Sequence, residues 1–339
     1  MVADSTEILQ RTDRAVVLGF SSARALARST FRGVVLTAAV AIAVMVFATR
    51  SVAQTPAVPA VTPATRTPCG DPDLQGVWDF RTLTPIERPV ALAGKQFLTP
   101  DEAAAIERNV LDGRSSWWDY GTALVEDRRT SLIVSPSDGT IPWAPDMRAR
   151  IANFNPPYLE GPEDRSLAER CLVGFNSGPP MLPSAYNNNL LVLQTPDYVV
   201  ILNEMIHSTR IVPLGGQPHL ASEFRHWVGD ARGHWDGDTL VVETTNFSDE
   251  TIFLDSSTQL HLVERFRRTD NNTLLYEFTL DDPAIWTAPW TAAVPMRRSE
   301  QPMFEYACHE GNYGMEGMLA GTRAEERRAA DAPQPRRGR

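Results

Sequence analysis

The sequence predicts a mainly β protein: an antiparallel meander that closes into a barrel, with a loop-rich insertion carrying two or more short helices. About eight short apolar segments separated by turn residues follow one another from Leu190 onward, which is the pattern of a meander. The segment from Asp71 to Asn189 is rich in proline instead, and proline interrupts long elements. A meander of this length has exposed edges unless it curls and closes, which favours a barrel.

The N-terminal region has the features of a secretory signal. Three arginines precede a 15-residue apolar stretch, Val34–Ala48, and the small residues Ser51 and Ala53 follow it. The stretch is shorter than the roughly 20 residues of a membrane-spanning helix. We therefore expect cleavage after Ala53, a periplasmic or secreted mature protein and no stable membrane insertion. A retained signal anchor is the alternative.

Composition divides the rest of the chain. A Pro/Ala/Thr-rich linker comes first, and an Arg-rich end with few apolar residues is expected to be a disordered tail. A single β-barrel domain lies between them. The predicted boundaries are 1–53 for the signal peptide, 54–70 for the linker, 71–320 for the domain (71–189 for the first strand and the insertion, 190–310 for the meander) and 321–339 for the tail.

Two helices are signalled in the insertion. The segment Thr99–Glu102 combines an N-cap threonine, a proline at the first helical position and a capping-box glutamate, and Gly113 ends the helix. Ser166–Glu169 repeats the capping box, and Gly174 ends the second predicted helix, which carries Cys171.

Recognisable turns separate the strands of the meander. Pro196-Asp197 lies between the first two, and Asp236-Gly237 is a strong hairpin signal because such turns need positive φ. In Thr273–Leu280, alternate residues are apolar and predict one buried face: Leu274, Tyr276, Phe278 and Leu280. In order, the predicted strands are LLVLQT, YVVILNE, TRIVPL, EFRHWVGD, GHW, TLVVETTNF, LHLVERFRR, TLLYEFTL and PMFEYAC.

Two resemblances bear on the fold and the location. Gly76-Val77-Trp78, within PDLQGVWDF, is similar to the Gly-x-Trp opening strand of lipocalin-like proteins, which implies a lipocalin-like barrel. The long segment between Trp78 and Leu190 departs from a simple lipocalin and leaves the strand count open. The chain also resembles a large group of uncharacterised secreted bacterial proteins, which implies an envelope location. This resemblance rests on PDLQGVWDF, PPMLPSAYNNN, TPDYVVILNEMIH, GDTLVVETTNF and YACHEGNYGMEG.

Charge and motif content exclude several classes of function. With 32 Lys+Arg against 42 Asp+Glu and a net charge of -10, the chain lacks the basic character of nucleic-acid-binding proteins. It contains no HExxH, CxxC, GxGxxG or P-loop motif, so the familiar hydrolase, dehydrogenase and kinase mechanisms lose support. We expect no cofactor. A divalent metal is the alternative, assembled across strands because histidine spacing does not signal a site.

The cysteines predict one disulfide. In an oxidising envelope, Cys171 and Cys308 are expected to pair, which leaves Cys69 free in the linker region. The competing hypothesis is a catalytic Cys308 beside His309, which requires a reduced thiol.

Four residues are the candidates for catalysis. Glu204 and His207 form a possible acid/base pair at the end of an apolar strand, and Arg210 is placed to hold an anion. His309, in the polar segment after the last predicted strand, is the second proton carrier. The alternative is that these polar residues meet water at strand and loop ends.

Six further residues are candidate ligand contacts. Tyr186, Asn187 and Asn188 offer groups for sugars or carbonyls, although asparagine also suits a turn. The others are the adjacent Trp117 and Trp118, of which one is free to line a groove, and Tyr313 in the closing loop. Together they predict a binding protein that holds a small apolar or aromatic-bearing molecule in the barrel mouth. The alternative is an enzyme performing cofactor-free hydration, isomerisation or elimination, or metal-assisted hydrolysis.

Overall fold

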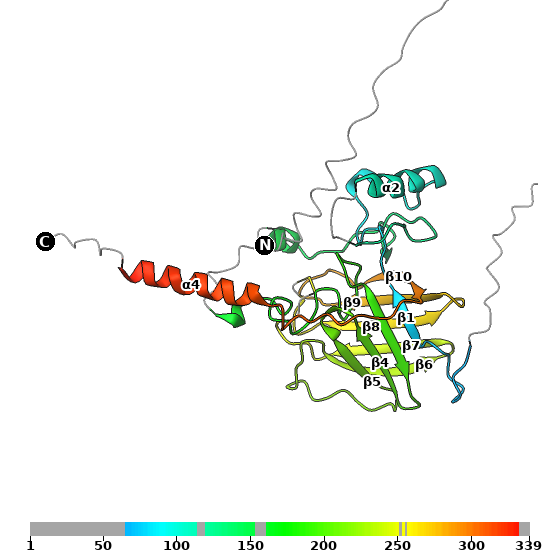
Figure 1. Ribbon diagram of the computed structural model, residues 1–339. Coiled ribbons are helices and arrows are strands. Elements are labelled where there is room, and N and C mark those ends of the chain that lie inside the picture. The colour runs from blue at the N-terminus through cyan, green and yellow to red at the C-terminus, as the bar shows by residue number, and fades with distance from the viewer. Residues whose placement is uncertain (1–64, 114–118, 153–160, 251–252, 255, 332–339) are drawn as a thin grey trace, which may run out of the picture. The chain divides into compact units, whose positions relative to one another are not determined.

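The computed structural model describes residues 65–113, 119–152, 161–250, 253–254 and 256–331 (Figure 1). The chain divides into two compact units, residues 1–60 and 61–339, and the first unit lies outside the described residues. The predicted signal segment and most of the predicted linker therefore also lie outside them. Within the described ranges, no helix is long and apolar enough to cross a membrane.

One 10-stranded antiparallel sheet dominates the fold, as the sequence predicts for a mainly β protein. Its strands follow the order β5-β4-β3-β1-β10-β9-β8-β7-β6, and β2 pairs with β10 off this path. The strands are β1 (Gly76–Asp79), β2 (Ile133–Ser135), β3 (Asn189–Gln194), β4 (Tyr198–Asn203), β5 (Thr209–Pro213), β6 (Asp230–Asp236), β7 (Thr239–Thr245), β8 (His261–Arg268), β9 (Thr273–Asp281) and β10 (Trp290–Ser299).

The sheet does not close into a barrel, which corrects the predicted closure. Nine strands alternate in direction along the path, so its two end strands, β5 and β6, run parallel, and no ladder joins them in the described chain. Their side chains nevertheless meet: a Cβ on Gly233 in β6 would lie 2.8 Å from Val212 in β5. Because it lacks that atom, Gly233 allows the two edges to approach. We call this line of contact the seam.

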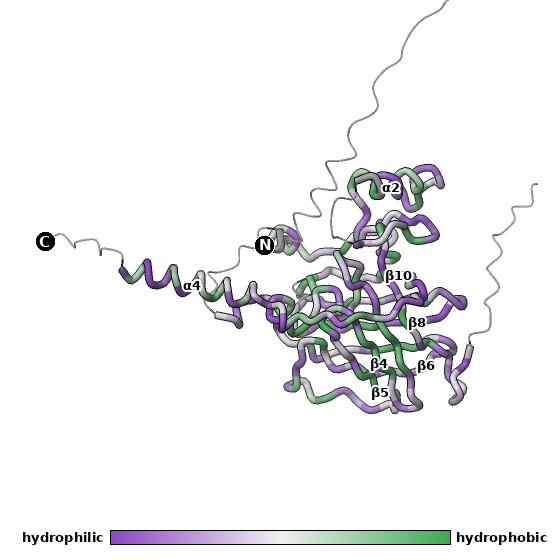
Figure 2. Tube along the Cα trace, in the orientation of Figure 1, coloured by the Kyte–Doolittle hydropathy of each residue, from purple (hydrophilic) through white to green (hydrophobic). Residues whose placement is uncertain are grey.

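The concave side of the sheet holds the core. The predicted alternation in β9 is confirmed, since Leu274, Tyr276, Phe278 and Leu280 are all fully buried. Aromatic rings from neighbouring strands fill the same space, including Phe266, which stacks on Tyr276 with ring centroids 4.8 Å apart. Figure 2 shows the corresponding hydrophobic runs along the strands. The described interior is therefore packed with side chains from neighbouring strands.

The helices follow the prediction in part. Helix α2 (Pro100–Gly113) is confirmed with its capping box: Thr99 N–H donates to Glu102 and Glu102 N–H donates to Thr99 Oγ1. Ser166 and Glu169 exchange similar bonds, but the predicted second helix is wrong because the chain only turns here. Cys171 adopts φ 57°, which a helix does not permit. The remaining helical segments are α3 (Met147–Ala152), α4 (Tyr313–Asp331), η1 (Val90–Leu92), η2 (Pro162–Asp164) and η3 (Met205–His207).

Two strand predictions are also wrong. The segment 223–229 forms a loop before β6, and 302–308 contains no strand. The last strand is instead β10, hidden in the sequence by Pro295. That proline is tolerated because β2 pairs with Thr291–Ala292 and β1 with Arg297–Ser299, so one side of β10 has no neighbour at residue 295.

The predicted disordered tail needs correction as well. Residues 321–331 continue helix α4, and 332–339 lie outside the described residues. The segment is rich in Ala, Glu and Arg, which have high helix propensity and need no buried face to form a turn or two.

Candidate functional site

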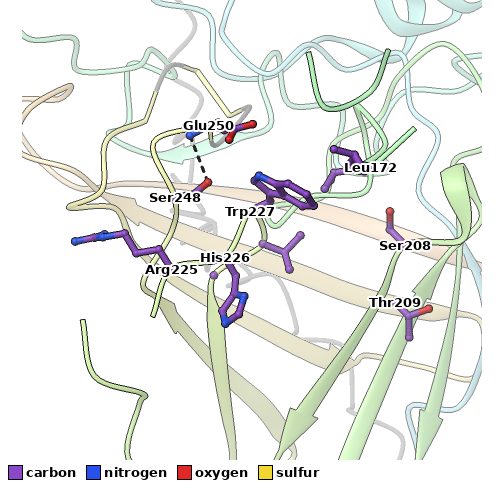
Figure 3. A pocket seen from close by; sticks show the side chains of 11 residues that line it. Leu172, Ser208, Thr209, Arg225, His226, Trp227, Ser248 and Glu250 are labelled. Atoms are coloured by element: carbon purple, nitrogen blue, oxygen red, sulfur yellow. Dashed lines mark hydrogen bonds between the residues drawn. The ribbon is translucent and has the colours of Figure 1, made fainter. Parts of the chain in front are cut away.

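A pocket of about 560 Å³ opens at one end of the seam. Leu172 and Val173 provide an apolar wall on one side. The loop before β6 contributes Trp227, and β5 contributes Thr209 at its first residue. Figure 3 shows Trp227 and His226 on the loop and Ser208 and Thr209 beside the neighbouring strand. The pocket thus combines an indole and three aliphatic side chains with hydroxyl, imidazole, guanidinium and carboxylate groups, which suits a small molecule with both apolar and polar parts.

Asp230 fixes one end of the loop that carries Trp227. Its carboxylate accepts hydrogen bonds from Leu220 N–H at 2.8 Å, from His219 Nδ1 at 3.1 Å and from the Arg232 guanidinium. Burial by itself raises the pKa of Asp230, but the bonds from Leu220, His219 and Arg232 outweigh it, so the pKa is lowered. The carboxylate therefore stays charged and holds residues 219–220 against β6.

Further bonds secure the rest of the loop. Asn246 Nδ2 donates to the carbonyl oxygens of Leu220 and Ala221, at 3.0 and 3.3 Å. The Arg225 guanidinium donates to the carbonyl oxygens of Phe247 and Thr258, both at 3.0 Å. The pocket wall is thus tied to the sheet at several points, and little ordering is required when a ligand binds.

The predicted acid/base pair lies next to this pocket. Glu204 is buried, and its carboxylate accepts from Asn189 Nδ2 at 2.7 Å and from Phe304 N–H at 3.1 Å. His207 is exposed in η3, immediately before Ser208 of the pocket lining. Ile206 and His207 both adopt positive φ, 55° and 42°, which is uncommon for any residue and rare for a β-branched one.

Arg210 does not join this pair. Strand alternation turns it into the sheet interior, where its guanidinium makes two bonds to Glu264 of β8, at 2.6 and 2.9 Å. The Tyr276 hydroxyl donates to the same carboxylate at 2.8 Å and accepts from Met181 N–H at 3.1 Å. The guanidinium of Arg210 is already paired with the carboxylate of Glu264. This pairing does not support the predicted role of Arg210 in holding an anion.

In this buried network, the surroundings keep Arg210 charged and Tyr276 neutral. Burial by itself lowers the pKa of Arg210, but the adjacent Glu264 raises it by more. Burial, followed by the charge of Glu264, raises the pKa of Tyr276 well above its ordinary value. Tyr276 therefore remains a neutral donor. The Arg210–Glu264–Tyr276 network connects β5 with β8 and β9 through the interior of the sheet.

The predicted disulfide between Cys171 and Cys308 is present, and Cys69 is free and exposed. The bridge anchors the segment that continues into Leu172 and Val173 of the pocket wall. His309 follows Cys308 and is exposed. A joint role of His309 with Glu204 and His207 stays a prediction.

None of the predicted ligand contacts in the described ranges is among the residues that line this pocket. Tyr186 stacks on Tyr306 with centroids 6.1 Å apart, and burial followed by a hydrogen bond with Tyr306 raises its pKa to about 12. Asn188 is buried and holds Ser184 by bonds of 2.8 Å in both directions. Asn187 has the φ of 53° that a turn requires. Tyr313 is 78% exposed at the start of α4. Trp117 and Trp118 lie outside the described residues.

Sequence reasoning missed the residues that line the pocket, chiefly His226 and Trp227. The segment EFRHWVGD was assigned to a strand, which would have spread its residues over two faces of the sheet. The local signal against a continuous strand is Gly229, which adopts φ 68°. In the described ranges, no group of three or more His, Cys, Asp or Glu residues is placed to bind a metal ion.

Comparisons with known proteins add little. No family model matches the chain, and no curated protein matches it. Two solved structures with a similar region are single-residue variants of the fluorescent protein UnaG. Each shares 14% sequence identity and a TM-score of 0.22, over 33% of this chain and 72% of the other. A TM-score of 0.22 supports no inference about fold or function.

Proposed function

We propose that this is a secreted or periplasmic protein of the lipocalin-like binding type, which holds a small apolar or aromatic-bearing molecule at the seam. The observation that carries the proposal is the pocket beside Thr209 and Trp227, at the edge of a sheet whose described inward side chains are mostly buried. The ligand site is thus at the opening between the two sheet edges rather than inside the sheet. Its wall is anchored by a disulfide, which suits a protein that works in an oxidising compartment.

Trp227 is the principal binding residue in this proposal. Its side chain is 38% exposed, so a ring face is available to stack on a flat ligand, and Leu172 and Val173 bury the apolar part. Thr209 and His226 offer polar contacts at the rim. Such a site needs neither a metal nor a cofactor to bind its ligand.

Binding of the fluorescent probe 1-anilinonaphthalene-8-sulfonate tests the proposal. We expect the protein to bind the probe, and Trp227→Ala to weaken binding by roughly tenfold, which corresponds to ~1.4 kcal/mol. Phe224→Ala is the matched control, because Phe224 is 57% exposed in the same loop and is not among the pocket residues. Equal affinities for the two variants contradict the proposed site.

A second candidate function, acid/base chemistry at the same pocket, is favoured by the backbone at η3. Positive φ at a non-glycine residue costs about 1–3 kcal/mol and persists where the surroundings enforce it, often at functional sites. Here it places His207 beside the pocket, close in sequence to Glu204, whose recorded bonds come from neutral donors. In this case His207 is present for its imidazole and not for stability.

Replacement of His207 by glycine tests this second function. Glycine adopts positive φ without strain, so we expect His207→Gly to raise the free energy of unfolding by roughly 1 kcal/mol in urea titrations. Ser208→Gly is the control, since Ser208 has φ -60° and glycine relieves nothing there. A less stable His207→Gly protein would show that the histidine serves the fold.

A further inference from the structure

The outward face of β3, β4 and β5 is apolar, although it faces solvent. Strand alternation directs nine residues outward, and seven of them are apolar or aromatic: Leu191, Leu193, Tyr198, Val200, Leu202, Ile211 and Pro213, with Asn189 and Thr209 as the polar members. We call this surface the β3–β5 face. An antiparallel sheet with one solvated side normally places polar residues there.

The residues of the β3–β5 face form one continuous patch. The pairing register places Leu193 beside Val200, and Val200 beside Ile211. Ile211 is 63% exposed, and Leu193 and Tyr198 are 44% exposed each. Contiguous apolar surface of this kind on a soluble protein marks an interaction site, whereas isolated exposed residues do not.

The charge of the surface indicates which partner fits. All nine outward positions lie in the described chain, and none is Asp, Glu, Lys, Arg or His. The chain as a whole has a net charge of -10, so two copies repel each other least when an uncharged face of each makes the contact. A membrane surface fits less well, since proteins that bind anionic membranes surround an apolar patch with basic residues.

We propose that the β3–β5 face is a self-association surface on which two copies of this chain pack sheet against sheet. Apolar contacts with few charges at the centre are typical of homodimers, and two sheet faces stack about 10 Å apart. With a two-fold axis lying across the strands, β4 runs antiparallel to its counterpart. The end of the face marked by exposed Asp197 then lies over the opposite end, where exposed His207 follows β4.

The surface is small, and this sets the expected strength. Three short strands offer a small interface, so we expect a weak dimer whose population depends on protein concentration. The pocket opens at the seam, beyond the edge of β5, and its Trp227 is not part of the face. Thr209 belongs both to this face and to the pocket lining, so the dimer covers one rim residue of the ligand site but not Trp227. The two proposals are tested separately, because Trp227→Ala leaves the face unchanged and Ile211→Glu leaves the pocket lining unchanged.

Sedimentation equilibrium of the purified protein over a range of concentrations tests the proposal. We expect a monomer–dimer equilibrium, with a dissociation constant raised at least tenfold by Ile211→Glu or Leu193→Glu, because each buries a charge at the interface. Leu275→Glu is the matched control: it makes the same change on the outward side of β9, next to Arg267. It should leave the constant unchanged.

Two results would overturn the proposal. The first is a wild-type protein that stays monomeric at every concentration, and the second is equal weakening by Leu275→Glu. Co-sedimentation of the monomer with neutral phosphatidylcholine vesicles, abolished by Ile211→Glu, would assign the face to a lipid surface instead. Circular dichroism of each variant confirms that the fold is retained.

Discussion

On the outside of the sheet, β3–β5 carries leucine, isoleucine and tyrosine, whereas β7–β9 carries charge. The outward residues of the second half include Glu243, Arg265 and Glu277, and His261 pairs with Glu243 at 2.9 Å. On the inside both halves are buried, mainly by aliphatic residues in β3–β5 and with aromatic residues added in β8 and β9. The fold constrains only the inner residues of each strand, so the outer residues are free to specify what each half contacts.

The two halves also depend on each other. Arg210 belongs to β5 and Glu264 to β8, and their ion pair crosses the interior between the halves with side-chain exposures of 4% and 0%. The outer surfaces differ in their contacts, but the halves share one core and are expected to unfold together.

The largest effect is expected from Glu264→Gln, which removes the interior link between the halves. It leaves the Arg210 charge buried and unpaired, which costs about 3–5 kcal/mol. Urea unfolding followed by tryptophan fluorescence should show the loss in a single transition. Two separate transitions would mean that the halves unfold independently. An unchanged free energy of unfolding would show that the ion pair does not link the halves.

The double variant Arg210→Met/Glu264→Leu sharpens this test. Replacing both charges by apolar groups avoids the unpaired charge and is often neutral or stabilising in buried ion pairs. We expect it to recover most of the stability lost in Glu264→Gln, with a residual loss because the Tyr276 hydroxyl no longer has an acceptor for its proton.

An intermediate effect is expected at the seam from Asp230→Asn. The change weakens three hydrogen bonds to a nearly buried carboxylate and should cost about 1–3 kcal/mol. Because the pKa of Asp230 is lowered in the fold, its contribution is complete above the unfolded pKa and is lost as the pH falls through the folded pKa. The stability difference between wild type and variant should therefore disappear in acid. A difference that persists there contradicts the charge-based role.

The smallest effect is expected on the charged outer face. His261 and Glu243 are 41% and 48% exposed, and exposed pairs contribute about 0–1 kcal/mol. We expect His261→Ala to change the thermal midpoint by at most a few degrees, with less effect at high salt. A loss comparable to that of Asp230→Asn would mean that the outer surfaces constrain the fold after all.

Local patterns predicted much of the meander. The hairpins around Pro196-Asp197 and Asp236-Gly237, the buried face of β9 and the capped helix α2 all depend on neighbours within a few residues, so they can be read from short segments. The Cys171–Cys308 pairing followed from a count of cysteines and an assumed oxidising compartment. The prediction of a closed barrel was wrong because closure depends on the number of strands. One strand more or less reverses the relative direction of the two edge strands, which are β5 and β6 here.

The candidate site was less predictable because its residues are joined across the fold. Arg210 looked like part of a local Glu–His–Arg cluster, yet its partner Glu264 lies on the far half of the sheet. The pocket gathers its lining from four separate loops and strands, and only Leu172, Ser208 and Thr209 adjoin a predicted residue. No short segment contains the signal for such a site.

The position of β1 has a consequence for how the protein is made. β1, the first strand of the described chain, lies between β3 and β10, so it acquires its second neighbour only when the last strand is available. Contacts between such distant residues form slowly and leave strand edges exposed until they do. A chain that emerges N-terminus first must therefore keep an unfinished sheet from pairing with other chains until residues 290–299 have appeared. Loss of the C-terminal segment would not shorten the sheet at its margin but divide it at the middle.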